Sequence, residues 1–444
     1  MILFRAKNSG VNAGDEAKLE ARKRGPRPLG HGNLLPSPYR RIFKNKDFLN
    51  LTLVNIFAQV AFAFLTLTLV TSIFTVTKSN FGVSGVVLSF VLPGLILVAF
   101  SGLSADLFDR AKIISFSIFA IALIVLGILF LFGNVFWMLA LSFAYHGFLA
   151  FYLPAFSAAS SQVVRRQQLL IANSVFTFCV MGGQIGGFLL VSFLQFFLHQ
   201  KFSLVLSEVL LIIAFLKSRS LPGLLPRKKV GEGLEYVIKT TKQILWAFFY
   251  IYNRKLLWFF VLVIAMVYGI YALGVTLGPG FFDEVIGMPI KSSPLFVFPL
   301  VAIGLLIGGY LVHMRLMNEA MWGGLGIALM GSLSLLLGLV IKFESHKNIL
   351  FWGVLSIFIV AGSLGAVMAI IAARTVLQKL VAHKYQGTVF AVVIMLSALS
   401  AASFSLLGVL FESILGYINI LIFGGIGLSI MAFLIGAVSF RWKS

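Results

Sequence analysis

Three titratable side chains stand inside long apolar stretches of this chain, where they could carry or relay a proton. An acid at bilayer depth costs about 2.5–3.5 kcal/mol to insert, so it is a functional candidate by default. Glu208 could load and release a proton, or it could reach the interface or pair with a neighbour. Glu412 ends a later stretch, where a cavity mouth and an ordinary solvated end both fit. His146 is either a proton relay or a hydrogen-bonded histidine between helices.

Neutral polar and aromatic side chains in other apolar stretches are candidates for a substrate cavity. Asn55 and Gln59 share one face of the first stretch, where they would line a water-accessible space or bond to a neighbouring helix. Gln184 stands among four glycines, which favour close helix packing at the interface between the two halves of the chain. Tyr268 and Tyr271 could stack on a hydrophobic substrate or belong to the aromatic belt at the membrane–water interface.

Catalytic and cofactor-binding patterns are missing from the sequence. It has no His-Glu-x-x-His zinc pattern, no serine–histidine dyad at a recognisable spacing and no phosphate-binding glycine loop. Cys179 is the only cysteine and lies in an apolar stretch, so we expect a small core residue and neither a disulfide nor a metal site. The sequence therefore predicts no enzyme, no cofactor and no metal.

The elements that must position these residues are membrane-spanning helices. Hydrophobic residues make up 60% of the chain and charged residues 11%, which excludes an ordinary soluble domain. About twelve apolar stretches have spanning length. We expect them near 48–76, 81–104, 112–132, 135–161, 169–198, 201–217, 255–280, 291–313, 321–341, 349–373, 386–411 and 414–440.

Positive charges give the predicted orientation. Of the 35 Lys and Arg residues, 30 precede the first stretch or fall in alternate connections, and five fall on the other side. Basic residues stay on the cytoplasmic side, so both termini should be cytoplasmic in the plasma membrane. The net charge of +21 is explained by the membrane surface, and we expect no nucleic-acid partner.

The polar interruptions divide the chain into four predicted parts. Residues 1–46 carry 11 basic residues and no apolar period, which predicts a disordered cytoplasmic tail. Residues 47–217 and 255–440 each hold six apolar stretches with weak echoes of one another, as in a transporter built from parallel repeats. Residues 218–254 form a linker whose later part has the pattern of an amphipathic helix on the cytoplasmic leaflet.

A charged motif joins the second and third stretches. Gly102 permits close helix approach, and Asp106 favours a helix N-terminus or an arginine. Asp109 follows, and Arg110 and Lys112 are placed to meet anionic headgroups.

This loop resembles the cytoplasmic signature of the major facilitator superfamily. Ala105-Asp106-x-x-Asp109-Arg110 is similar to the branch that holds macrolide-efflux and enterobactin-exporter proteins, as are the segments 43–48 and 154–174. The resemblance implies an all-α membrane protein with two six-helix bundles, in which Asp106 and Arg110 form a latch that holds the outward-open state. Leu107 departs from the pattern, because a basic residue usually follows the aspartate.

The resemblance also implies secondary transport by alternating access. With few buried charges, we expect a small hydrophobic or amphipathic cargo, and the resemblance to efflux proteins implies that it is exported. We expect a monomer that contacts membrane lipid. Proton coupling stays open, because the first stretch has no acid after Asp47. The alternatives are a lipid or lysolipid flippase of the same fold and a membrane scaffold that does not transport.

Overall fold

The computed structural model describes residues 42–160, 162–164, 168–224, 233–314, 319–343, 349–382 and 385–441, and these residues are built from helices. Helices of the amino-terminal half are α3 (Lys46–Thr77), α4 (Asn80–Leu107), α5 (Arg110–Phe130), α6 (Val135–Ser160), α7 (Leu169–Phe197) and α8 (Gln200–Ser218). Those that follow are α9 (Gly233–Tyr252), α10 (Lys255–Gly280), η3 (Phe281–Ile286), α11 (Ser293–His313), α12 (Glu319–Phe343), α13 (Ile349–Leu380) and α14 (Gln386–Arg441). The η3 segment is a π-helix.

The twelve helices predicted as spans are present in the described part of the chain. Ten helical segments are long and apolar enough to cross a membrane. One of them is α14, which contains two spans because Gly416 bends it with a φ of 75°, a conformation that favours glycine. The shorter α8, with Glu208 in its middle, is the twelfth.

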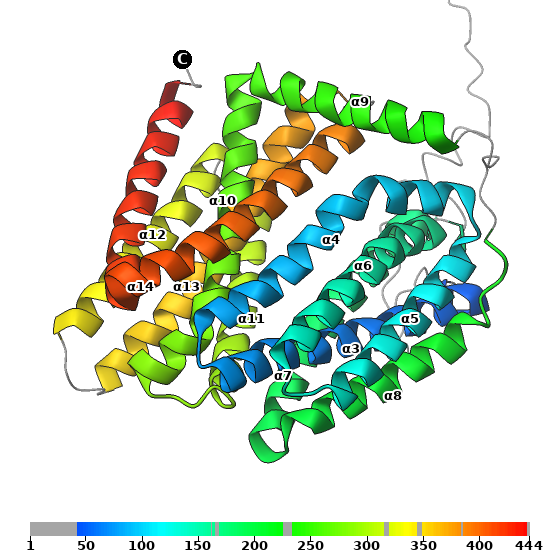
Figure 1. Cartoon of the computed structure of the whole chain (residues 1–444). Helices are drawn as coiled ribbons and strands as arrows, with labels where there is room; N and C mark the ends of the chain where they lie inside the picture. The colour runs from blue at the N-terminus through cyan, green and yellow to red at the C-terminus, as the bar shows by residue number, and fades with distance from the viewer. Residues whose placement is uncertain are drawn as a thin grey trace, which may run out of the picture.

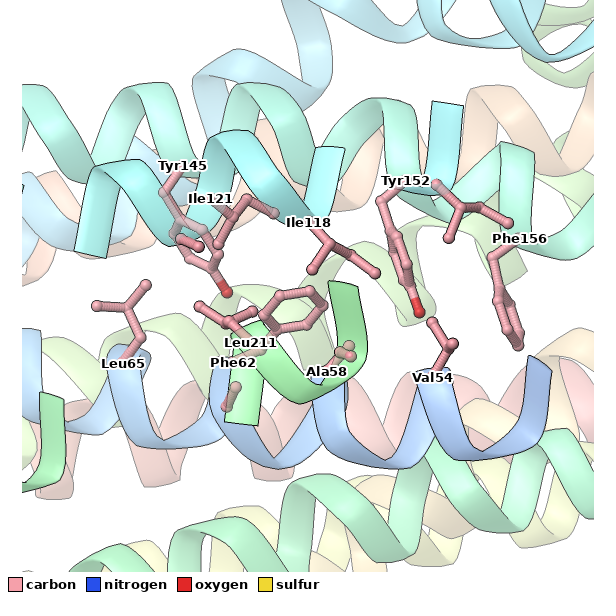
Figure 2. Packing of buried hydrophobic residues seen from close by; sticks show 14 of the residues in the cluster. Val54, Ala58, Phe62, Leu65, Ile118, Ile121, Tyr145, Tyr152, Phe156 and Leu211 are labelled. Carbon is pink, nitrogen blue, oxygen red and sulfur yellow. The ribbon is translucent and has the colours of Figure 1, made fainter. Parts of the chain in front are cut away.

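Helices α3 to α8 pack into one unit, which we call the N-terminal bundle (Figure 1). Its core gathers buried side chains of α3, α5, α6 and α8 (Figure 2). Phe62 lies between the rings of Tyr145 and Tyr152, at 5.8 and 5.6 Å between centroids. Ile42, within the predicted tail, is fully buried in the same core, and α3 begins at Lys46. Residues 1–41 lie outside the described residues.

Helices α10 to α14 form the C-terminal bundle. Its core joins α10, α12, α13 and α14 through residues such as Ile264, Ile327, Ala373 and Val389. Small residues let backbones meet here, since a Cβ on Gly365 of α13 would collide with the Gly326 carbonyl oxygen of α12. Such contacts hold helices together where lipid supplies no hydrophobic drive.

Helix α9 lies across one end of the C-terminal bundle and reaches α4 of the other bundle (Figure 1). The rings of Trp246 and Tyr250 pack against Tyr385, at the start of α14. We call this the linker end of the molecule. The opposite end, with the α3–α4 turn, η3 and the bend in α14, is the distal end.

Candidate functional site

A polar cluster connects three helices inside the N-terminal bundle. The Gln59 amide donates to Asn55 at 3.4 Å, and the hydroxyl of Tyr152 donates to the same Asn55 oxygen at 3.3 Å. Gln184 of α7 donates to Gln59 at 3.3 Å. Asn55 and Gln59 are almost fully buried, whereas Gln184 is exposed. Three of the predicted cavity residues are therefore one network, in which Gln184 is the member that faces open space.

The glycines around Gln184 correct one expectation. A Cβ on Gly183 would lie 2.9 Å from Gln59, and one on Gly187 would lie 2.7 Å from Ala63, both residues of α3. The close packing is therefore within the N-terminal bundle, whereas we expected it at the interface between the two halves. Close contact between α7 and α3 also brings Gln184 within reach of Gln59.

Glu208 is buried on α8. Its neighbour Ser207 donates to the Ala61 carbonyl of α3 at 3.0 Å, which holds the two helices together. Glu208 is 7% exposed, and its Oε2 atom has no hydrogen-bond partner in the structure. This is the position that a proton-loading residue would need.

His146 lies inside α6, 4% exposed. Its Nδ1 is 2.8 Å from the Ser142 carbonyl of its own helix, and its ring packs edge-on against Phe90 of α4 at 5.0 Å. The contact between helices is therefore aromatic, and the hydrogen bond stays within α6. Neither predicted role is decided by this arrangement.

An arginine just past the end of a predicted span lies beside one of the predicted tyrosines. Helix α13 continues to Leu380, beyond the predicted end of the span, so Arg374 is within it. Its Nη2 donates to the Tyr268 hydroxyl of α10 at 3.3 Å. Tyr268 and Tyr271 are 37% and 65% exposed.

Polar contacts between the two bundles lie at the distal end. Lys78, after α3, forms an ion pair with Asp283 of η3 at 3.3 Å. Asn80 of α4 bonds to the Tyr417 hydroxyl of α14. The π-helical turn η3 brings Asp283 to Lys78.

Glu412 stands next to this distal contact. It and Glu284 lie close enough to Tyr417 to interact with its hydroxyl electrostatically. Glu412 is partly exposed. Its two predicted settings, a cavity mouth and a solvated helix end, and its proton-coupling role stay predictions.

Apolar contacts between the bundles lie in the same half of the molecule. Val87 and Val91 of α4 pack with Ala272 of α10. Phe188 of α7 stacks on Phe298 of α11, with centroids 4.7 Å apart. An exposed ion pair contributes only about 0–1 kcal/mol, so these apolar contacts do most to hold the distal end closed.

Each bundle has a polar side chain one helical turn from these apolar contacts, on the side of the linker end. Gln184 precedes Phe188 by four residues, and Tyr268 precedes Ala272 by four, so each shares a helix face with a contact residue. Both side chains are nevertheless exposed. The bundles thus touch at the distal end and leave these side chains uncovered nearer the linker end.

Two of the predicted latch residues contact the linker. Asp109 caps α5, accepting from the Ala111 amide, and the same Oδ1 accepts from the Leu224 amide, both at 3.0 Å. The amide of Arg110 donates to the Leu224 carbonyl, and its Nε donates to Ala105. Asp109 and Arg110 therefore tie the start of the linker to the α4–α5 turn.

The remaining members of the motif lie around this turn. The side chain of Asp106, in the last turn of α4, is outside the described part. A Cβ on Gly102 would meet open space, so the close helix approach expected there is absent from this arrangement of the bundles. Lys112 borders a hollow of about 770 Å³ lined mainly by apolar side chains of α4, α5 and α6.

Comparison with known proteins decides the family. The model of the Major Facilitator Superfamily matches residues 48–405, most of the chain. The chain belongs to the major facilitator superfamily. Its members are transporters, in agreement with the expectation that this chain is not an enzyme. A search of curated protein sequences gives no significant match.

Solved structures of other major facilitator proteins share the fold. The nucleoside transporter NupG is 13% identical with a TM-score of 0.67, over 88% of this chain and 99% of NupG. A mutant of the peptide transporter POT is 14% identical with a TM-score of 0.70, over 89% and 95%. A bacterial homologue of the lysosomal transporter Spinster, solved inward-facing, is 16% identical with a TM-score of 0.63, over 86% and 83%. At these identities the likeness shows the fold alone.

Proposed function

We propose that this major facilitator protein exports a small hydrophobic or amphipathic compound by alternating access, and that the present arrangement is open toward the cytoplasm. One observation carries the proposal: contacts between the bundles gather at the distal end, while Gln184 and Tyr268, one turn away, are exposed. A substrate held between the bundles would therefore be reached from the linker end. Rocking of the bundles would reverse which end is open.

The excess of basic residues supports a cytoplasmic linker end. Both termini and the linker then face the cytoplasm of a cell whose plasma membrane holds the protein. The direction of transport rests on the resemblance of the α4–α5 motif to macrolide-efflux and enterobactin-exporter proteins.

Flux in reconstituted vesicles tests the proposal. Vesicles containing the full chain are loaded with lipophilic cations, macrolides, siderophores or lysolipids, and release is followed with and without a pH gradient. Release of a soluble amphipathic compound supports the exporter. Movement of lysolipid alone favours the flippase, and no flux with any compound favours the scaffold.

Proton coupling is assigned to Glu208 in this proposal, since its Oε2 is buried without a partner. Glu208→Gln keeps the shape and removes the proton, so flux should no longer respond to a pH gradient. Glu284→Gln, at an exposed position of the π-helical turn at the distal end, is the control and should keep the response. Wild-type flux that does not depend on the pH gradient would exclude proton coupling.

A further inference from the structure

Arg374 is a positively charged residue within the spanning helix α13. Charged side chains within spanning helices are costly, and they mark substrate or ion pathways. By helix rise, Arg374 lies about 9 Å from the linker end of α13, whereas Tyr268 lies about 20 Å from the linker end of α10. The hydrogen bond between them means that the guanidinium points toward the middle of the bundle.

This direction argues against an arginine that merely reaches the membrane surface. A snorkelling side chain near a helix end extends toward the closer interface. Arg374 extends the other way, following the tilt of helical side chains toward the start of their own helix. Arg374 also lies beside the face of α10 that contacts α4. The α10 residue in that contact is Ala272, one helical turn after Tyr268.

The guanidinium has most of its hydrogen-bonding capacity left. Arginine offers five N–H donors, and the bond described for Arg374 uses one of them. Among the described residues, the ion pair we find is Lys78–Asp283, so no described carboxylate pairs with Arg374. Planar arginine is suited to hold a carboxylate or phosphate through two parallel bonds.

Aromatic surface adjoins this cation. Tyr268 and Tyr271 lie one turn apart on α10, with 37% and 65% of each side chain exposed. A ring or acyl chain attached to an anion could cover them while the anion stays on Arg374.

We infer that Arg374, Tyr268 and Tyr271 form a subsite for a single anionic group, carboxylate or phosphate, carried on an apolar body. The inference rests on the proposed transport function and narrows its substrate class to amphipathic anions. Such an anion could be a water-soluble aromatic acid or a lysolipid headgroup, which share the chemistry that Arg374 recognises.

Ligand-dependent thermal unfolding of the full chain in lipid nanodiscs tests this subsite. One arm compares 2-naphthoate and 1-naphthyl phosphate with neutral 2-naphthamide, and the other compares lysophosphatidylglycerol with neutral monoacylglycerol. Each anion should bind wild type about tenfold or more tightly than its neutral partner, because hydrogen bonds to a charged group are the strong ones. A preference in the naphthyl arm assigns the subsite to soluble anions, and one in the lysolipid arm alone assigns it to lipid.

Variants separate the subsite from general charge attraction. Arg374→Gln should lose the preference for anions, and Arg374→Lys should keep part of it. Arg254→Gln is a matched control, because Arg254 also bonds to a tyrosine hydroxyl, that of Tyr250, but at the start of α10 outside this site. It should keep the full preference.

Two results would overturn the subsite: no anion preferred over its neutral partner, or a preference that survives Arg374→Gln. Failure of the transport proposal would look different. If the bundles change between two arrangements but the anions do not bind, the transport proposal stands and the subsite is excluded. If the anions bind but the bundles stay in one arrangement, the subsite stands and the transport proposal is excluded.

Discussion

Single glycines decide how closely helices approach in this protein. Gly187 lets α7 lie against α3, where an added Cβ would be 3.2 Å from the Val60 backbone, while Gly186 points into open space. Gly187→Ala should therefore destabilise the protein by about 1–3 kcal/mol through overpacking. Thermal unfolding measures this, with Gly186→Ala as the matched control. Equal unfolding temperatures for the two variants would contradict the packing described here.

A second glycine tests the distal contact. A Cβ on Gly280 would collide with the Tyr417 hydroxyl and the Asn80 amide, whereas one on Gly278 would meet nothing. Gly280→Ala should open the distal end, since the overlap costs about 1–3 kcal/mol in the closed arrangement. Labelling of a cysteine at Val87 by an impermeant maleimide, in a Cys179→Ser background, should then become faster. Gly278→Ala should label like the parent, and slow labelling of Gly280→Ala would count against a distal closure.

Sequence reasoning found polar candidates at this scale but not all of their connections. Asn55, Gln59 and Gln184 were recognised because polar side chains stand out in apolar helices, and the structure joins them. Arg374 was missed because a basic residue near the end of a span has the pattern of a cytoplasmic loop. Its role depends on where α13 ends and on which helix lies beside it, and neither follows from hydropathy.

At the scale of elements, the turn between α4 and α5 controls the start of the linker. Asp109 both caps α5 and accepts from the Leu224 amide. Asp109→Ala should cost about 1 kcal/mol of helix capping and release this segment. Limited trypsin digestion should then cut the linker faster. Asp47→Ala, which removes an acid from the first turn of α3, is the control and should be cut at the parental rate.

Helices themselves were the most predictable elements. Spanning length and hydrophobicity are set by the bilayer, so the predicted stretches coincide with the observed helices within a few residues at most ends. The exceptions are informative: α13 runs seven residues past its predicted end, and α14 continues through its predicted break with only a bend at Gly416. Hydropathy changes gradually at such places, so the sequence shows no sharp boundary.

At the scale of the whole molecule, the proposed function depends on two bundles that change their relative tilt. The family signature predicted this architecture, and the structure shows it. The pairing of Lys78 with Asp283, residues 205 positions apart, could not be predicted, because it depends on how the two bundles meet. Apolar contacts between the bundles are equally hidden, since a leucine facing lipid and one in a contact have the same pattern.

Distances between spin labels on the two bundles test the central claim most directly. Labels at Phe130 and Ile349 report the distal end, and labels at Phe108 and Gln378 report the linker end; all four side chains are exposed. In nanodiscs, a disulfide between Lys78→Cys and Asp283→Cys should shorten the distal distance and lengthen the linker distance relative to the reduced protein. Distances that ignore the disulfide, or that change together in the same direction, would contradict alternating access.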